Sequence, residues 1–367
     1  MNRFIATFYS MAVTIKHVAK HAGVAVGTVS RVINGRPDVS PVLREKVERA
    51  IRELNFRPNA RAQSLGRNAS PIISFILSNR SILHPFHARV LQGVEEYCAN
   101  AGYFVVFARF DYARDTPSRE VRLPAVLQSH GIADCVIVAG TNYMNFLEAL
   151  AGLEMKHVVL GNNVVGADER PPVDQVFFDD HGGMSEAARY LIELGHRKIY
   201  FVGDTSLPWC DHRHRAYVKT MGEAGLEPHG MTSGLADDHF MQGLNGVSCL
   251  LDQGHEVTAI LAGNDDVAYG AWEALNRHGL SVPEDVSLIG FDDQYGPRRF
   301  PQLTSVRVPT DIVGWELGKM AIEKIKTGGQ PLPEVIVPTK LERRGTCRPV
   351  AAERVGEPGQ SEVIAAN

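Results

Sequence analysis

Three polar side chains come after apolar runs of the kind that form buried strands. Asp292 follows SLIGF, Asn264 follows TAILAG, and His84 comes after IISFIL. A carboxylate accepts hydrogen bonds from paired hydroxyls, an amide donates and accepts, and an aromatic ring such as Phe86 can stack on a flat ligand. Ligands of parallel sheets bind beyond the carboxyl ends of the strands. These residues therefore predict a binding site for a small polar molecule.

An alternating pattern would position these side chains. From Pro71 onward the short apolar runs IISFIL, YFVVFARF, CVIVAG and HVVLG alternate with amphipathic helical segments, and the alternation restarts after VFFDD with GGMSEAARYLIELGHRKIYFVGD. Such alternation is typical of βαβ units around a parallel sheet. Two similar halves predict a bilobed α/β domain over residues 71–350, with its ligand in the cleft.

The N-terminal part of the chain has a different charge balance. Residues 1–68 contain 12 Lys/Arg and 4 Asp/Glu, whereas the remaining residues contain 26 basic and 38 acidic side chains. The overall charge of −4 therefore hides a short basic head on a long acidic body. This split favours a polyanion-binding module joined to a second domain.

The basic head reads as three short helices between Thr14 and Asn55. Gly23 permits a tight turn between the first two, and the second, from Ala25 to about Ile33, leaves Arg31 facing outward. Ser40 can cap the third helix and Pro41 suits its first position, after which apolar residues repeat at three- and four-residue spacing. The pattern fits a generic three-helix bundle, but the short second helix and the basic excess favour a DNA-binding helix-turn-helix over 12–58.

Composition limits the other possibilities. No apolar run reaches the roughly 20 residues that span a bilayer, and the N-terminus does not resemble a signal peptide, so a cytoplasmic protein is expected. The five cysteines are far apart, and the adjacent histidines of Asp211-His212-Arg213-His214 rarely converge on a metal, so no cofactor or metal is expected. No nucleophile elbow, P-loop or G-x-G-x-x-G motif is present, which argues against an enzyme.

The stretch TIKHVAKHAGVAVGTVSRVINGRPDVSPVLREKVERAIRELNFRPNARAQSL closely resembles the headpiece of the lactose/galactose repressor family of bacterial transcription regulators. The resemblance implies that the second helix enters the major groove, with Val26, Gly27 and Arg31 at base-reading positions. Arg31 can offer a bidentate fork to guanine. The family usually has Ser where this chain has Ala25, so a helix cap is missing. Phosphate or backbone contacts are implied for Thr14, Thr28, Ser30 and Asn34.

The same resemblance makes residues 59–70 a hinge helix that orders on DNA as a pair from two subunits. Leu65 matches a leucine that wedges into the minor groove, and Asn59 and Ala62 are expected in the same interface. A simple flexible linker is the alternative. Residues 1–11 and 351–367 are expected to be disordered, and the tail lacks leucine heptads, so a dimer is favoured over a tetramer.

The segments ELGHRKIYFVGD, GNDDVAYGAWEAL and GLSVPEDVSLIGFDD resemble the effector domain of that family, which is akin to periplasmic sugar-binding proteins. The resemblance implies one lobe over about 71–173 and 304–330 and another over about 174–303 and 331–350. The family places Asp-Arg or Asp-Trp where this chain has Gly161-Asn162, which leaves the transfer of known contacts in doubt. The implied effector-binding residues are His84, Phe86, Asn162, Arg213, Asn264 and Asp292.

These features predict a regulator, most simply a repressor, that binds a palindromic operator as a homodimer. A small molecule in the cleft would change lobe closure and so the affinity for DNA. The Asp/Arg/Asn set with one aromatic ring favours a sugar, and a purine or another metabolite is the alternative. A solute-binding transport protein would suit the body alone, but the headpiece argues against it.

Overall fold

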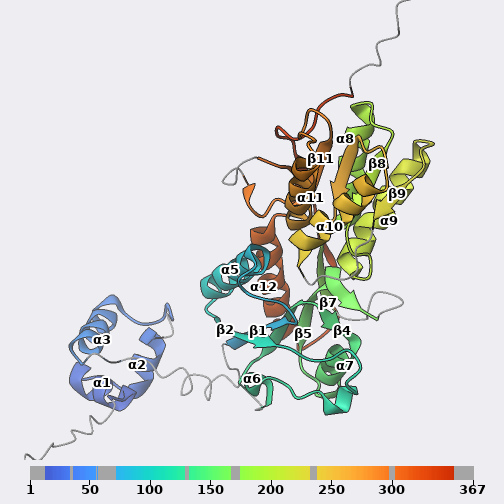
Figure 1. Ribbon diagram of the computed structural model, residues 1–367. Coiled ribbons are helices and arrows are strands. Elements are labelled where there is room, and N and C mark those ends of the chain that lie inside the picture. Colours follow the sequence, from blue (N-terminus) through green and yellow to red (C-terminus); the bar gives the residue numbers. More distant parts are fainter. Residues whose placement is uncertain are drawn as a thin grey trace, which may run out of the picture. The chain divides into compact units, whose positions relative to one another are not determined.

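The computed structural model describes residues 13–33, 36–54, 56, 72–128, 132–166, 174–231, 238–296 and 302–350. The chain separates into two compact units, Met1–Pro71 and Ile72–Asn367 (Figure 1). The described residues do not include the expected extension at 1–11, the hinge at 59–70, the tail at 351–367 or the side chains of Asn34, Asn59, Ala62 and Leu65.

The first unit contains the helices α1 (Ile15–Ala22), α2 (Val26–Ile33) and α3 (Pro41–Glu53). Gly23 ends α1 with a φ of 66°, in the left-handed region that glycine adopts without strain. Ser40 caps α3, since its Oγ accepts from the backbone N–H of Leu43 at 3.4 Å, and Pro41 is the first helical residue. Val18, Val29 and Val47, one from each helix, are completely buried and form the centre of the small core.

The second unit begins with a parallel sheet whose described strands have the order β13-β7-β5-β3-β1-β2. Side chains of alternate residues in β1 point to opposite faces of this sheet. Phe75 and Leu77 pack with α5 and α12, while Ile76 packs with α7 on the other face. The strands are β1 (Ile72–Ser78), β2 (Phe104–Phe110), β3 (Cys135–Gly140), β5 (His157–Leu160), β7 (Asp174–Phe178) and β13 (Val335–Val337). The other elements of this lobe are α5 (Pro85–Asn100), η1 (Ser118–Glu120), α6 (Ala125–Gln128), β4 (Asn142–Tyr143), α7 (Met144–Gly152), η2 (Gly161–Asn163), β6 (Val164–Val165) and α12 (Thr310–Lys326).

A second sheet has the order β14-β12-β11-β10-β8-β9, with β14 antiparallel to β12 and the other pairs parallel. Phe201 and Leu261 pack toward α8 and α9, whereas Val202 and Ile260 pack toward α10 and α11. The strands are β8 (Ile199–Val202), β9 (His229–Met231), β10 (Ala259–Ala262), β11 (Ser287–Asp292), β12 (Thr304–Arg307) and β14 (Lys340–Glu342). The helices are α8 (Asp180–Glu193), α9 (Pro208–Glu223), α10 (His239–Asp252) and α11 (Asp265–Arg277).

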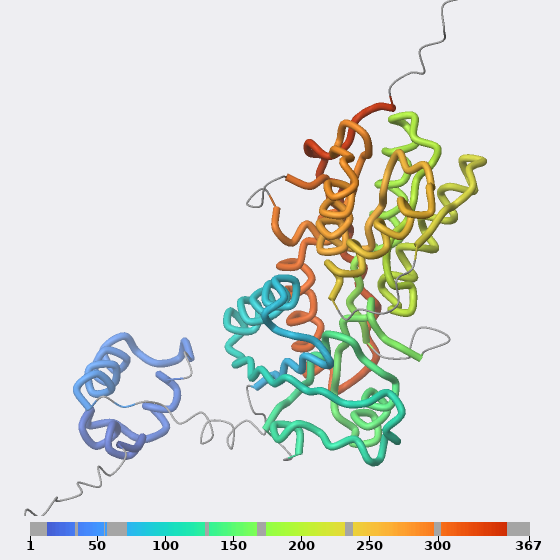
Figure 2. Tube along the Cα trace, viewed as in Figure 1, coloured from blue at the N-terminus to red at the C-terminus, as the bar shows by residue number. Residues whose placement is uncertain are grey.

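The chain passes between the two sheets at three places, which Figure 2 lets the reader follow by colour. These crossovers lie between β7 and α8, between β12 and α12, and between β13 and β14. The approximate boundaries expected near 173, 303 and 330 each come a few residues before these crossovers, because β7 and β13 pair within the first sheet and β12 within the second. The physical reason is that an apolar strand can be buried in either sheet, so its sequence does not show which lobe it belongs to. The lobe depends on the strand that it pairs with: β7 pairs with β5 in the first sheet, and β12 pairs with β11 in the second.

Candidate functional site

One face of α2 is open to solvent in the first unit. Val26 is 42% exposed, and a Cβ added at Gly27 would meet nothing within 4 Å. Thr28 and Ser30 are half-buried, and Arg31 is exposed. The face thus presents an apolar contact, a bare stretch of backbone and a guanidinium, which together fit the edge of a base pair and the phosphates beside it.

Arg31 and Ala25 define the two ends of this face. The Nη1 atom of Arg31 lies 4.0 Å from Oδ2 of Asp38, and both side chains are exposed, so this weak pair can be exchanged for a DNA contact. The carbonyl of Ala25 accepts from the backbone N–H groups of Thr28 and Val29, which is the geometry of an N-cap residue. Alanine has no side-chain acceptor for the next free N–H, so this helix lacks the cap that Ser or Thr would supply. Thr14 stands at the N-cap of α1, where its N–H donates to Nδ1 of His17 at 3.1 Å.

A cleft of about 880 Å³ opens in the second unit, and residues of both lobes line it. All six side chains that the sequence points to are in its wall, although they are up to 208 positions apart in the chain, between His84 and Asp292. Its wall includes the side chains of Arg80, His84, Phe86, Thr141, Asn162, Asn163, Trp209, Arg213, His239, Asn264, Asp266 and Asp292.

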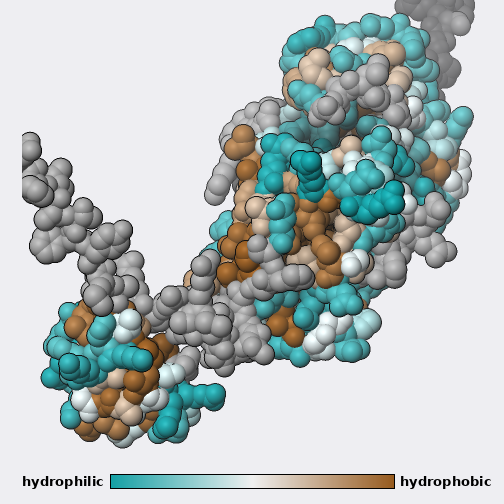
Figure 3. Space-filling view, turned by 90° about the horizontal axis from the view of Figure 1, so that it is seen from below, coloured by the Kyte–Doolittle hydropathy of each residue, from teal (hydrophilic) through white to brown (hydrophobic). Residues whose placement is uncertain are grey.

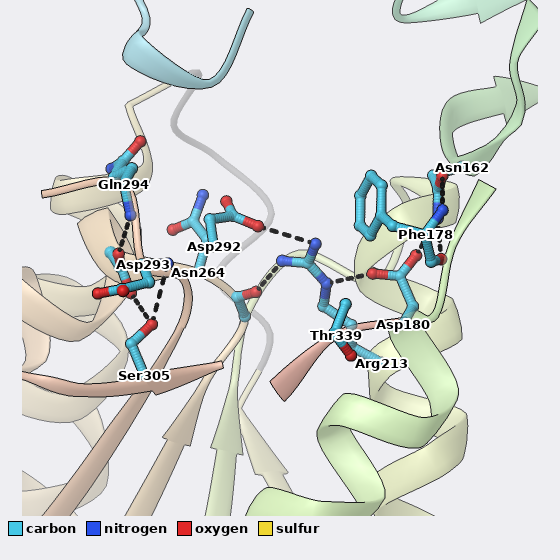
Figure 4. A network of polar contacts seen from close by, with 12 residues as sticks. Asn162, Phe178, Asp180, Arg213, Asn264, Asp292, Asp293, Gln294, Ser305 and Thr339 are labelled. Carbon is cyan, nitrogen blue, oxygen red and sulfur yellow. Dashed lines mark hydrogen bonds and ion pairs between the residues drawn. The ribbon is translucent and has the colours of Figure 1, made fainter. Parts of the chain in front are cut away.

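Arg213 is the most tightly held of these side chains. It projects from α9, and its side chain is only 2% exposed. Nε donates to Oδ1 of Asp180 at 2.7 Å, Nη1 to the carbonyl oxygen of Gly263 at 2.7 Å, and Nη2 to Oδ1 of Asp292 at 3.0 Å (Figure 4). Its guanidinium also stacks on the ring of Phe291, with 3.6 Å from Cζ to the ring centroid. The fork is thus fixed before any ligand arrives.

Asp292 ends β11 with a φ of 97°, an uncommon and strained conformation for a residue with a side chain. Strain of this kind is found where a side chain must point in a particular direction for binding. Burial raises the pKa of its carboxyl, and the nearby Arg213 guanidinium opposes that rise. The carboxylate and the fixed guanidinium are paired in the wall of the cleft, so an acceptor and a donor group lie beside each other there.

The two cleft asparagines that the sequence points to, Asn162 and Asn264, bond mainly to neighbouring protein groups. Asn162, in η2, donates from Nδ2 to the carbonyl of Phe178 and to Oδ2 of Asp180, both at 2.8 Å, and its Oδ1 accepts from the N–H of Phe178 (Figure 4). Asn264 caps α11, since its Oδ1 accepts from the N–H of Val267 at 2.9 Å. Both residues line the cleft, but their contacts position other parts of it.

His84 connects the two lobes across the cleft. It stands at the N-cap of α5 in the first lobe, and its Nε2 lies 3.5 Å from Oδ2 of Asp266, on α11 of the second lobe. The hydroxyl of Tyr295 donates to Oδ1 of Asp266 at 2.7 Å. Burial on its own raises the pKa of Asp266, but the hydrogen bonds from His84 and Tyr295 outweigh it and hold the pKa at about 2. Phe86, the second residue of α5, packs edge-on against Phe178 at the crossover.

Several residues of the wall were not singled out from the sequence. Trp209 lies one helical turn before Arg213, and the centroid of its ring is 4.8 Å from the Arg213 Cζ atom. Arg80 donates from Nε to Oγ1 of Thr141 at 2.9 Å. The i, i+4 spacing of Trp209 and Arg213 on one helix is a signal that could have found the tryptophan. By contrast, Tyr217, four residues after Arg213, does not line the cleft. Its buried hydroxyl bonds to the backbone carbonyl oxygens of Ile199 and His229.

Among the residues that the structure describes, no group of three or more His, Cys, Asp or Glu side chains is arranged to hold a metal ion. No helix in the same part of the chain has the length and apolar character needed to cross a membrane.

A helix-turn-helix unit whose second helix has an exposed face, joined to a bilobed α/β unit with a polar cleft, is the arrangement of DNA-binding transcription regulators that carry a sensor domain. Comparison with known proteins agrees. Residues 14–59 match the model of the bacterial regulatory proteins of the lacI family, and residues 188–347 match that of the periplasmic binding protein-like domain. The transcriptional regulator CelR of Thermobifida fusca is 31% identical over 317 residues, which cover 85% of this chain and 92% of that protein. The chain belongs to the lacI family.

Solved structures show the same likeness over nearly the whole chain. The complex of the transcriptional regulator CelR with cellobiose is 27% identical, has a TM-score of 0.66, and covers 91% of this chain and 99% of that one. The lac repressor bound to ONPG in its repressed state is 25% identical, has a TM-score of 0.75, and covers 92% of this chain and 100% of that one.

Proposed function

We propose that this regulator is a repressor that binds a palindromic operator as a homodimer and that a sugar in the cleft controls its affinity for DNA. The observation that carries the proposal is the pairing of Arg213 with Asp292 inside the cleft, where a fixed fork of donors adjoins a carboxylate acceptor. A sugar hydroxyl both donates and accepts, so neighbouring hydroxyls of one ring can satisfy both groups.

The charge of this end of the cleft favours a neutral ligand. Asp180 and Asp292 flank the single guanidinium of Arg213, so the buried trio has one more negative than positive charge when both carboxylates are ionised. An anionic group placed beside Asp292 would be repelled, whereas hydroxyls would be accepted. That the related CelR structure contains cellobiose is consistent with a sugar of some kind.

The dimer is supported by apolar side chains exposed on the first lobe. Phe104 and Phe107 of the edge strand β2 are 62% and 38% exposed, and Ile312 and Trp315 of α12 are 50% and 37% exposed. Figure 3 shows apolar (brown) side chains on the surface of the second unit, to which this lobe belongs. An exposed edge strand with apolar neighbours is a liability in a monomer, and a second copy of the chain would cover it.

The proposed control is a two-state equilibrium between open and closed lobes. A sugar that contacts residues of both lobes binds the closed state better and shifts the population toward it. The change in lobe closure would alter the spacing of the DNA-binding segments across the dimer, so the affinity for the operator changes by the difference in binding energy between the states. Because the partner is chromosomal DNA, we place the protein in the bacterial cytoplasm.

A thermal-shift screen of the full chain tests the ligand class. The panel contains D-galactose, D-ribose, cellobiose, gluconate, glucose 6-phosphate, adenine and guanine. We expect a neutral sugar to raise the midpoint of unfolding, because a ligand that binds only the folded state stabilises it by mass action. A shift with a purine alone would overturn the sugar assignment and leave the regulator assignment intact.

A mobility-shift assay with DNA from upstream of the gene tests the DNA-binding half. The full chain should retard the fragment, and a chain that begins at Ile72 should not. Equal retardation by both chains would place DNA binding outside the helix-turn-helix unit and contradict the proposal.

A further inference from the structure

His239 is the first residue of α10 and lies in the wall of the cleft. Its Nδ1 atom is 2.7 Å from Nδ2 of Asn264, and its ring packs against Trp209 with 5.5 Å between centroids. Two neighbours therefore hold the imidazole in place. Neither the resemblance in the sequence nor the function proposed above uses this side chain.

Proton positions in this pair follow from the hydrogen-bond partners. The N–H of Val267 can only donate, so the Asn264 side-chain atom that faces it must be the oxygen. The atom of Asn264 that faces His239 is then the amide nitrogen, which can only donate. The Nδ1 of His239 must accept this bond, so a neutral ring carries its hydrogen on Nε2.

We propose that His239, held by Asn264 as the Nε2–H tautomer, is a second hydrogen-bond donor of the effector cleft and selects ligands that present an acceptor oxygen to it. This inference rests on the proposed function, since it names a specificity-determining contact of that same site. Asn264, in turn, acts as a positioning residue for the imidazole.

The surroundings of the ring keep it in this state. Arg80 and His84 face it from the first lobe, Asp266 from α11, and Asp238 from the residue before it. Burial lowers the pKa of His239 to about 4, and the charge of Arg80 acts in the same direction, while Asp266 and Asp238 oppose it. The ring is therefore neutral between pH 5 and 8, and its donor atom does not change over that range.

A ligand oxygen opposite Nε2 would be recognised by geometry rather than by charge. Sites built to hydrogen-bond a particular oxygen reject analogues without it, because the donor is then left unpaired. Arg213 and His239 would thus read two separate positions of one sugar.

The first test needs no sugar. The full chain is labelled with ¹⁵N-histidine, long-range ¹H–¹⁵N spectra are recorded from pH 5.5 to 8, and the His239 signal is assigned by its loss in His239→Phe and in His239→Asn. We expect the shifts of a neutral Nε2–H tautomer with no titration in this range. An Nδ1–H tautomer, or a midpoint within the range, would overturn the proposal.

Asn264→Asp gives a sharper outcome. The carboxylate can still cap α11, but it places an oxygen where Nδ1 now finds a donor, so Nδ1 must become protonated. We expect the His239 signal to change to the Nδ1–H tautomer or to an imidazolium that titrates above pH 5.5. Asn163→Asp is the matched control, since Asn163 lines the same cleft but donates to Thr141 at 2.8 Å instead of to His239. An unchanged His239 signal in Asn264→Asp would contradict the assignment.

Calorimetry with D-galactose, D-ribose and cellobiose tests the donor role directly. His239→Phe retains a ring against Trp209 and removes the N–H. The variant should therefore bind the sugar that binds the wild type about tenfold more weakly, which is the usual effect of one lost hydrogen bond. Unchanged affinity would overturn the donor role. If none of the three bound the wild type, the sugar assignment would fail, and the spectra above would still decide the state of His239.

Discussion

Arg213 donates from Nε to Oδ1 of Asp180 at 2.7 Å, and this contact connects the cleft to the first residue of α8. The other carboxylate oxygen of Asp180 accepts from Asn162, in η2 of the first lobe, at 2.8 Å. The Nη2 atom of Arg213 in turn donates to Oδ1 of Asp292. Four buried side chains thus form one line of contacts from the first lobe, past the β7–α8 crossover, to the base of the cleft (Figure 4).

Asp180→Asn should break this line. An amide at this position loses the charge-assisted bond to Arg213 and cannot accept from both Arg213 and Asn162, so we expect a loss of about 1–3 kcal/mol in the free energy of unfolding, measured in urea. Glu223→Gln is the control, because Glu223 forms an exposed pair with Lys219 and should change stability by less than about 0.5 kcal/mol. Similar small effects in both variants would show that the buried line contributes little.

Asp292→Asn should separate DNA binding from the response to sugar. The amide has nearly the same shape but no charge, so operator binding without sugar should remain and the sugar-induced change in affinity should fall at least about tenfold. Fluorescence anisotropy with labelled operator measures both quantities. A normal sugar response in this variant would dismiss Asp292 as a ligand contact.

Arg31→Ala should reduce discrimination at one base pair of each half-site. One bidentate arginine–guanine contact is worth about 1–3 kcal/mol, so the affinity for operator should fall while the affinity for random DNA changes little. Arg277→Ala, which removes an exposed arginine of α11 paired with Glu273, should leave both affinities unchanged. Equal losses on operator and on random DNA would refute the base-reading role of Arg31.

Ala25→Ser should add the missing cap of α2. The backbone at this position already has the N-cap hydrogen bonds, so a side-chain oxygen needs no rearrangement and should stabilise the helix by about 1 kcal/mol. Amide hydrogen exchange of α2 in the full chain measures the effect as slower exchange of its first turn. Ala22→Ser, at the end of α1, should produce no such slowing; if both substitutions act alike, the effect is not a cap.

Asp265→Asn should change how stability depends on pH. Asp265 is buried, and burial together with the charge of Asp292 raises its pKa well above 3.8, although Ser305 and the N–H of Gln294 oppose the rise. Its contribution to stability is therefore full below pH 3.8 and is lost as the pH rises toward the folded-state pKa. The variant should gain stability relative to the wild type as the pH rises from 4 to 7, and a constant difference over that range would contradict this.

Local signals in the sequence predicted the local structure well. Ser40 and Pro41 start α3 where their chemistry indicates, and Gly23 makes the turn after α1. The strand-end positions of Asn264 and Asp292 placed both side chains in one cleft, because parallel strands end at the same edge of a sheet. Leu43 does not follow this agreement: it fits the apolar repeat of α3, but its side chain is 37% exposed and lies outside the small core of the first unit.

Contacts between distant residues could not be predicted in this way. The partner of His84 is Asp266, more than 180 positions away, and the amide of Asn162 is taken up by Asp180 across a crossover. Neither pairing has a local pattern, because each depends on how the two lobes meet. The positions of the crossovers could not be predicted either, because they depend on which strands pair. The role proposed for His239 likewise depends on a hydrogen bond from Asn264, which is 25 positions away in the chain.

The central claim is that the cleft controls the DNA-binding unit. It is tested most directly by the affinity of the full chain for a fluorescent operator from upstream of its gene, measured at fixed salt with and without the sugar that stabilises the protein. We expect the chain to bind the operator at least about 10³-fold more tightly than a scrambled sequence, and its affinity to change at least about fivefold when that sugar is added. A sugar that binds the chain and leaves the affinity for the operator unchanged would contradict it.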